Sequence, residues 1–473
     1  MKQAGSKTAA ILPLYIPVVL SYLLIYSPVV SFFIAWAGSF FIFYHTWFSN
    51  SRYYKTDLPV EKQVMRPIFL LQLIFAGFMA CTSIFYFLDH IGYRYFTKLA
   101  IGDAFLEKDK TFIIAQCQRM ALLAHAALVT GMILAISRKK VAPLYKLQNK
   151  RNILLKLGVT IYLLGMISQQ IPGLHQVSLP LTNIGISCAA VVFLQGVLNK
   201  NVLYISVGSA IFFLNFIQAS LSGFKEPIII NVIVLCAIFY PYYKKAILIL
   251  SIPILYILLY FLPSYNQIVR TSWSGEITAE NAQSQAFETL IGNANEDEIS
   301  ETNWEFLTNR FSEINMFTEF AQYVPEKRDY YGWEIFNQSV TALIPRVFWP
   351  AKPNIEEISM ERVYEAGVAN RLSTVSAKTR PVVDAYLSWG IIGVFFTMLI
   401  YGVLVQAISN RAENIFSGYE IGCVIMFNSL FQNLWRGNNF EFMINNIFYA
   451  YLIMWFLWWV LKYMLIIKPS YTT

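Results

Sequence analysis

Three prolines, two cations and two aromatic residues share the eleven positions of LIPRVFWPAKP, residues 343 to 353, between long apolar blocks. Pro350 and Pro353 bias the residues before them away from the α region, which makes this backbone stiff and extended. Arg346 and Lys352 are therefore held at a low cost in conformational entropy. Because a guanidinium group stays charged and can hold phosphate oxygens with two hydrogen bonds, the segment predicts an anion site centred on Arg346.

Further cations are expected on the same side of the membrane as Arg346. They are Arg310, Arg371, Lys378, Arg380 and Arg436. Any one of them is explained equally well as a solvated or salt-bridged surface group. That explanation is weaker for the whole set, because Arg346 sits in a proline-braced segment and Arg436 at the end of an apolar span, where an uncompensated cation is costly. A lipid pyrophosphate at a membrane surface is the anion that such a set would suit.

Carboxylates close to these cations are candidates for proton transfer. Asp384 follows Arg380 by four residues, and Glu441 follows Arg436 by five. Both stand at the expected outer starts of apolar spans, where the helix dipole alone favours a carboxylate. The alternative is that one of them takes the proton from an attacking hydroxyl, as a general base must. Glu313, close to Arg310, is a weaker third candidate.

The histidines and the known short motifs offer no other chemistry. None of the four histidines lies in the stretch 263–382 that carries most of the candidate cations. No HExxH, paired CxxC, Walker loop or GxSxG sequence occurs, so zinc, ATP and acyl-serine chemistry lack support. No cofactor is expected, and no cluster of ligand residues argues for a metal site, so the need for a metal stays open.

The elements that position these residues are apolar helices. Hydrophobic residues make up 56% of the chain and charged residues 14%, far from the quarter or so that is charged in soluble domains. Runs long enough to cross about 30 Å of hydrocarbon predict an all-α integral membrane protein with about twelve transmembrane helices. They lie near residues 9–26, 28–48, 66–89, 112–136, 153–171, 178–198, 201–219, 226–241, 245–262, 382–408, 419–435 and 441–461.

The chain thus divides into an N-terminal membrane region of about nine helices (1–262), one large loop (263–381) and a C-terminal membrane region of about three helices (382–473). Lys and Arg collect between spans two and three, four and five, and eight and nine. The positive-inside rule places these connections and both termini in the cytoplasm and the large loop outside. The first span follows two lysines without a small-residue cleavage site, so it is interpreted as a retained anchor.

The large loop differs in composition from the rest of the chain. Residues 263 to 382 hold ten Lys and Arg against seventeen Asp and Glu, and no cysteine. The basic charge of the chain is therefore a topology signal, and a nucleic-acid partner is not expected. The acidic stretch 271–309 is expected to be mobile. The apolar spacing of Trp304, Leu307, Phe311 and Ile314 predicts a short amphipathic helix within residues 304–324. A second is predicted over residues 333–344, ended by Pro345.

These loop features resemble a known family. YYGWEIFNQSVTALIPRVFWPAKP, with its Pro-Arg, Trp-Pro and Lys-Pro pairs, and YLSWGIIGVFFTMLIYG at the start of the next span are similar to the O-antigen polymerase (Wzy-type) family of bacterial repeat-unit polymerases. The specific part covers residues 304–402, and elsewhere the likeness is in span number and topology. Some members have an Arg followed at a set distance by Gly, and Arg380 with Gly390 is a loose version of that spacing.

The resemblance implies an integral-membrane glycosyltransferase of a GT-C-like class in the bacterial inner membrane. Its substrates would be undecaprenyl-pyrophosphate-linked oligosaccharides, and the growing glycan would move onto the non-reducing-end hydroxyl of the incoming repeat unit. The product would be O-antigen, capsule or exopolysaccharide. Membrane lipids would surround the protein, and a chain-length regulator and a flippase are further partners that the resemblance leaves open. The predicted roles are proton transfer or charge stabilisation by Arg346, Arg310, Asp384 and Glu441, and pyrophosphate binding by Arg346, Lys352, Arg371, Arg380 and Arg436.

Three other functions stay open. An O-antigen ligase would share the topology and the lipid donor, but its family relies on a histidine in the large loop, and this loop has none. A transporter of lipid-linked glycans would fit the span number, although no internal repeat is visible in the sequence. A scaffold of a polysaccharide assembly complex would use the loop charges as contact surfaces.

Overall fold

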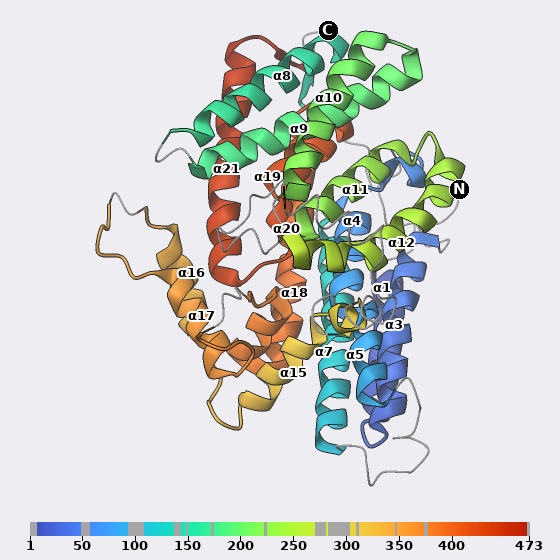
Figure 1. The fold of residues 1–473 in the computed structure, drawn as a ribbon, viewed down its shortest axis with the longest axis vertical. Helices are drawn as coiled ribbons and strands as arrows, with labels where there is room; N and C mark the ends of the chain where they lie inside the picture. Colours follow the sequence, from blue (N-terminus) through green and yellow to red (C-terminus); the bar gives the residue numbers. More distant parts are fainter. Residues whose placement is uncertain are drawn as a thin grey trace.

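The computed structural model describes residues 7–48, 57–92, 108–136, 143–147, 150–171, 175–221, 225–269, 281, 303–308, 312–345, 348–372 and 377–470. Helices make up nearly all of this part of the chain (Figure 1). The described residues also contain one two-stranded antiparallel sheet, which is called the ribbon below. The N-terminal region contains α1 (Lys7–Ile11), η1 (Leu12–Tyr15), α2 (Ile16–Leu23), α3 (Pro28–Phe48), η2 (Val60–Gln63), α4 (Pro67–Phe75), η3 (Ala76–Cys81), α5 (Ser83–His90), α7 (Lys108–Ala135), β1 (Tyr145–Leu147), α8 (Lys150–Gln169), α9 (His175–Asn199), α10 (Val202–Leu221), α11 (Lys225–Phe239) and α12 (Lys244–Val269). The remainder contains α15 (Ile314–Tyr323), α16 (Glu334–Leu343), α17 (Ile355–Glu365), α18 (Pro381–Ile415), η6 (Tyr419–Phe427), α19 (Asn428–Leu430), α20 (Gln432–Arg436), α21 (Phe440–Tyr463) and β2 (Ile467–Pro469).

The helices confirm the coarse part of the prediction, an all-α chain with membrane-length helices. Each of the twelve predicted spans coincides with a helical segment. Within the described residues, eight helices are long and apolar enough to cross a membrane: Pro28–Phe48, Pro67–His90, Asp109–Ala135, Asn152–Gln169, Ser178–Asn199, Val202–Leu221, Pro381–Ile415 and Phe440–Tyr463. Lys7–Leu23, Glu226–Phe239 and Tyr419–Leu430 form shorter apolar helices. The chain is therefore an all-α membrane protein.

α7 packs closely against α18. Gly131 of α7 and Gly402 of α18 make this approach possible. A Cβ atom at Gly131 would collide with the carbonyl of Leu399, and one at Gly402 with the carbonyl of Leu128. Small residues of this kind let helix backbones approach closely in membranes, where dispersion contacts replace the hydrophobic effect as the driving force.

A break near the start of α18 separates its first turns from the long span. Trp389 and Gly390 have non-helical dihedral angles, and Gly390 has a φ of 60°. That φ is strained for any residue with a side chain, and the Tyr330 hydroxyl lies 3.1 Å from where a Cβ would be. The predicted tenth span, 382–408, is therefore not one continuous helix. Residues 381–388 form a separate helical segment, from which Asp384 contacts Arg362 of α17 and Tyr386 donates to the Val324 carbonyl.

The loop between α12 and α18 contains the helices α15, α16 and α17. The predicted helix over 333–344 is present as α16, and Pro345 follows it. Of the amphipathic helix expected over residues 304–324, the described residues show helical structure at 303–308 and α15 from Ile314 to Tyr323. The acidic stretch 271–309 falls largely outside the described residues. α17 was not predicted. Its N-terminus is capped by Asn354, which accepts a hydrogen bond from the Glu356 amide at 3.2 Å.

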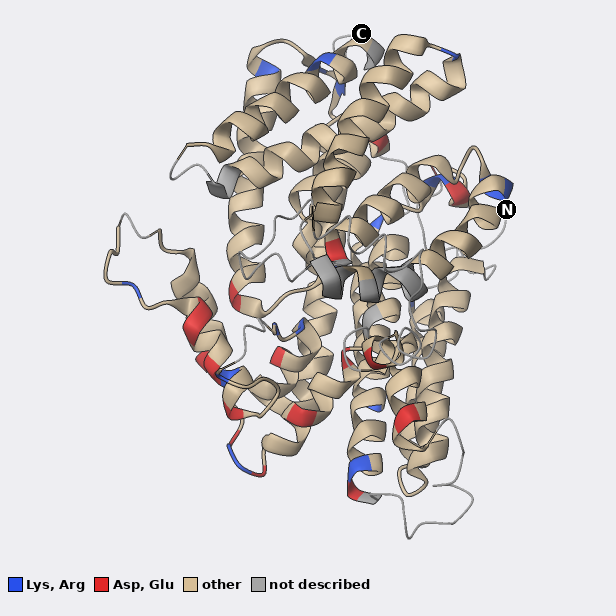
Figure 2. Cartoon of the chain, in the orientation of Figure 1, with Lys and Arg blue, Asp and Glu red and all other residues tan. Residues whose placement is uncertain are grey.

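The connections gather at two ends of the molecule. At one end β1 pairs with β2 of the C-terminal tail, Arg66 binds Glu413 at the end of α18, and Lys7 donates to the Leu134 carbonyl at the end of α7. At the other, α15, α16 and α17 lie beside the first turns of α18 and α21 (Figure 1). Figure 2 shows that acidic residues are frequent on these three helices.

Candidate functional site

Two of the predicted cations meet where α18 and α21 begin. Arg380 directly precedes α18, and its guanidinium Nη1 donates to the carbonyl of Gly437 at 2.9 Å. Gly437 follows Arg436 and has a φ of 74°, which forms the turn between α20 and α21. The side chain of Arg380 also binds the carboxylate of Glu313 at 2.8 Å. Sequence positions 313, 380 and 436 thus come together, although they are far apart in the chain.

Glu226 of α11 pairs with Arg436. Two guanidinium nitrogens of Arg436 lie 2.9 Å from the two carboxylate oxygens of Glu226. The side chains of Arg380 and Arg436 are 19% and 25% exposed, so both remain accessible from outside the bundle. Burial alone would lower the pKa of Arg380, but the Glu313 carboxylate outweighs burial and raises this pKa above its usual range. Arg380 therefore stays charged.

An apolar cavity opens next to these two arginines. It holds about 30 Å³ and lies between α4, η3, α18 and α20. Apart from Arg380, Arg436 and the Gly437 turn it is lined by apolar and aromatic residues, namely Leu71, Ile74, Phe75, Met79, Pro381, Val382, Met398, Tyr401, Leu434 and Trp435. The cavity is far smaller than a ligand site, so its relevance is that two guanidinium groups at its rim offer binding partners to an anion.

One turn further along α18, Asp384 joins the two C-terminal helices. One of its carboxylate oxygens accepts a hydrogen bond from Thr379 at 2.6 Å. The other accepts from the backbone N–H of Phe440, the first residue of α21, at 2.8 Å. Asp384 is completely buried, and both oxygens have a partner. Its main role in the fold is therefore to fix the start of α21 against the start of α18.

Glu441 has different surroundings. It is 1% exposed, and its Oε1 lies 2.6 Å from Nη2 of Arg362 as an ion pair. Within the described part of the chain, the other oxygen, Oε2, has no hydrogen-bond partner. A carboxylate with one oxygen held by an ion pair can still accept a proton on the other.

Arg362 of α17 completes the cluster, although it is not among the predicted site residues. Its side chain is 3% exposed and lies 3.8 Å from Asp384. Its Nη1 donates to Gln338 of α16 at 2.9 Å. Burial lowers the pKa of Arg362, but the carboxylates of Asp384 and Glu441 outweigh burial and raise the pKa above its usual range, so the guanidinium stays charged. The sequence offers no signal that singles it out, because Arg362 is one cation in a charge-rich stretch.

A polar pocket opens on the outer side of Arg362, between α16 and α17. It holds about 400 Å³ and is lined by Arg328, Tyr331, Glu334, Gln338, Glu357, Ile358, Glu361, Arg362 and Glu365. Arg328 pairs with Glu334 at 3.1 Å and with Glu365 at 2.9 Å. Burial raises the pKa of Tyr331 to about 12, so its hydroxyl keeps its proton at neutral pH.

The other predicted cations lie apart from this cluster or outside the described residues. The ammonium group of Lys352 donates to the carbonyls of Ala342 and Ile344 at the end of α16. Arg371 is 62% exposed and pairs with Glu361. Lys378 lies 4.0 Å from the centre of the Phe442 ring. Arg310 and Arg346 fall outside the described residues. Of the described cations in the predicted set, Arg380 and Arg436 are the two that the structure brings together.

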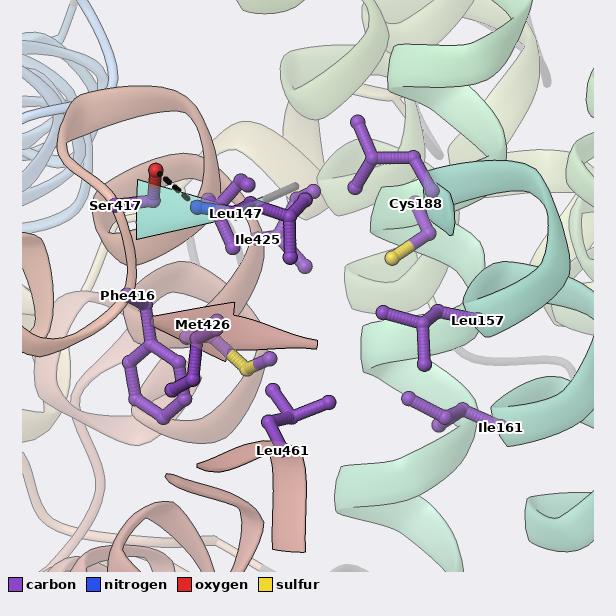
Figure 3. Close-up of a pocket in the computed structure, with 12 residues that line it drawn as sticks. Leu147, Leu157, Ile161, Cys188, Phe416, Ser417, Ile425, Met426 and Leu461 are labelled. Atoms are coloured by element: carbon purple, nitrogen blue, oxygen red, sulfur yellow. Dashed lines mark hydrogen bonds between the residues drawn. The ribbon is translucent and has the colours of Figure 1, made fainter. Parts of the chain in front are cut away.

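A second cavity, at the opposite end of the molecule, presents only apolar surface. It holds about 10 Å³ between α8, α9, η6, α21 and the ribbon. Figure 3 shows side chains such as Leu157, Ile161, Cys188 and Leu461 around it, and one hydrogen bond from the Leu147 amide to the Ser417 hydroxyl. This space is a small gap in the helix packing.

The fold and this cluster define a polytopic α-helical membrane protein with a charged site at the starts of α18 and α21. Residues 16–469 match the model of a family described as a domain of unknown function, DUF8712, and the chain belongs to that family. No curated protein and no solved structure matches the chain.

Proposed function

We propose that this protein is a repeat-unit polymerase of the bacterial inner membrane, similar to the O-antigen polymerases. It transfers a growing undecaprenyl-pyrophosphate-linked glycan to the non-reducing-end hydroxyl of an incoming lipid-linked repeat unit. All twelve helical segments cross the membrane in a GT-C-like arrangement. The end with the ribbon and both termini faces the cytoplasm, and the end with α15, α16 and α17 faces outward.

One observation carries this proposal: Arg380 and Arg436 meet at the rim of an apolar cavity, next to the buried carboxylates of Asp384 and Glu441. A polyprenyl pyrophosphate has its charged head at the membrane surface, and the two arginines offer a partner to that head. The guanidinium groups would exchange part of their pairing with Glu313 and Glu226 for pyrophosphate oxygens.

The site can also support the transfer step. The acceptor oxygen forms a bond to the anomeric carbon of the donor sugar as the bond from that carbon to the pyrophosphate oxygen breaks. Arg380 and Arg436 stabilise the negative charge on the departing pyrophosphate. The acceptor proton passes to Oε2 of Glu441, which has no hydrogen-bond partner within the described residues, and then to water. Asp384 positions α21 and thereby Glu441.

Replacing either arginine tests the proposal. Removal of one such charge-stabilising group costs roughly a hundredfold to a thousandfold in rate, so Arg380→Ala and Arg436→Ala should each leave surface glycans of a single repeat unit. A deletion strain is complemented with each variant, and the glycans are separated on a gel. Lys327→Ala is the control, because Lys327 is an exposed cation of the same loop that lies in neither the predicted set nor the site, and it should restore the wild-type ladder.

The same gel separates the alternative functions. Wild-type ladders from both arginine variants, at normal protein level in the membrane, would contradict the proposed site. Long polymer that stays on the lipid carrier in the deletion strain would indicate a ligase. Repeat units that never reach the outer face would indicate a transporter.

A further inference from the structure

The pocket between α16 and α17 has the dimensions of a ligand site. Its volume of about 400 Å³ lies within the roughly 300 to 1,000 Å³ of small-molecule sites. Carboxylates, an amide, two guanidinium groups and a tyrosine form most of its wall. These groups donate and accept hydrogen bonds around one aromatic ring, which is a lining that suits a hydroxyl-rich ligand such as a sugar.

A buried, incompletely bonded cation lies at the inner wall of this pocket. Arg362 is 3% exposed, and its Nε has no hydrogen-bond partner within the described part of the chain. Its Nη2 is 2.6 Å from Glu441. A hydroxyl group that binds to Arg362 from the pocket would therefore lie next to the carboxylate that takes the proton in the proposed reaction.

The pocket and the arginine-rimmed cavity lie on two sides of the carboxylates. Arg380, Pro381 and Val382 line the cavity, and Arg362 lines the pocket. Asp384 lies between these groups, one turn from Arg380 on α18 and 3.8 Å from Arg362. A transferase needs two substrates that approach the reacting atoms from different directions, and this arrangement provides two such routes.

From these observations, and resting on the proposed function, we infer that the pocket between α16 and α17 binds the acceptor sugar, and that this sugar is neutral or carries an amino group. Four glutamates and two arginines line the pocket, so its charge is net negative. Arg328 is already shared by Glu334 and Glu365. An acidic sugar such as a uronic acid would meet like charge there, whereas hydroxyl and amino groups would find acceptors.

A steric block tests the position of the acceptor. Ile358 lines the pocket and is partly buried, so Ile358→Trp fills space without removing a polar group. Ile355 is one turn earlier on α17, is also partly buried and does not line the pocket, so Ile355→Trp is the matched control. In the complemented deletion strain, Ile358→Trp should reduce polymer longer than one unit by about a hundredfold, and Ile355→Trp should give the wild-type ladder.

The donor side is measured separately with undecaprenyl pyrophosphate and the purified full-length protein. This lipid should raise the melting temperature of wild type and of Ile358→Trp equally, because the block leaves Arg380 and Arg436 in place. A full ladder from Ile358→Trp, or loss of its lipid-induced shift, would overturn the acceptor assignment. If complementation with wild type leaves the glycans of the deletion strain unchanged, or if wild type shows no lipid shift, the proposed function itself fails.

The charge of the acceptor is tested by composition analysis. The repeat unit made by the native strain is released, and the sugar at its non-reducing end is identified. A neutral or amino sugar is the expected result. A uronic acid or another acidic sugar at that position would contradict the selection by the pocket carboxylates.

Discussion

Two buried carboxylates lie close together in the site, but their contacts give them different roles. Both oxygens of Asp384 accept hydrogen bonds, from Thr379 and from the first amide of α21. Glu441 is held through its ion pair with Arg362. A general base must have a lone pair free to receive the proton, and Glu441 meets that requirement better than Asp384.

This difference predicts unequal effects of neutral substitutions. Glu441→Gln should lower the polymerisation rate by about a hundredfold or more, the usual contribution of a general base. Asp384→Asn should lower it by less than about tenfold, because an asparagine can accept from the Phe440 amide and donate to Thr379. The rate is measured as polymer formed per amount of purified protein supplied with lipid-linked repeat units. A larger loss in Asp384→Asn than in Glu441→Gln would reverse the two roles.

Most residues of the cluster could be predicted from the sequence alone. Arg380, Asp384, Arg436 and Glu441 flank apolar spans, where charge is costly and therefore conspicuous in a sequence. Arg362 was missed because it lies in a charge-rich stretch where one more cation carries no signal. Only the fold places its side chain against Asp384 and Glu441.

At the scale of elements, the long spans were predictable and their interruptions were not. Apolar length alone indicates a span, so Trp389 and Gly390 were read as part of a continuous helix. The structure breaks the helix there, because Gly390 can adopt a positive φ and Tyr330 occupies the space beside it. The break matters because it separates the segment that carries Asp384 from the membrane span.

The close contact of α7 with α18 leads to a stability prediction. Gly402→Ala should destabilise the protein by about 1 to 3 kcal/mol, the usual cost of overpacking a tight interface, because its Cβ would collide with the Leu128 carbonyl. Gly77→Ala is the control, since a Cβ there meets no atom within 4 Å. Thermal unfolding in detergent is followed with a thiol-reactive dye, which reports exposure of the buried Cys117, Cys188 and Cys423. Equal melting temperatures for the two variants would show that the interface can relax.

For the whole molecule, contacts between distant connections define two opposite ends. Arg66 and Glu413, Lys244 and Glu61, and the two strands of the ribbon join segments that the charge pattern had assigned to one side. The sequence could not predict these pairings, because they depend on how the helices pack. They nevertheless agree with alternating spans, since each pairing connects segments that alternation places at the same end.

Membrane-impermeant maleimide labelling of intact spheroplasts determines which end faces outward. Arg371→Cys replaces an exposed residue between α17 and α18, and it should be labelled directly. Lys146→Cys replaces an exposed residue of β1, where Lys146 lies opposite Lys468, and it should be labelled only after permeabilisation. Wild type gives the background, because its described cysteines are buried or partly buried. The reverse pattern would place Arg380, Arg436 and Glu441 in the cytoplasm, where no outward-facing polymerase could use them, so this measurement bears on the function as well as on the topology.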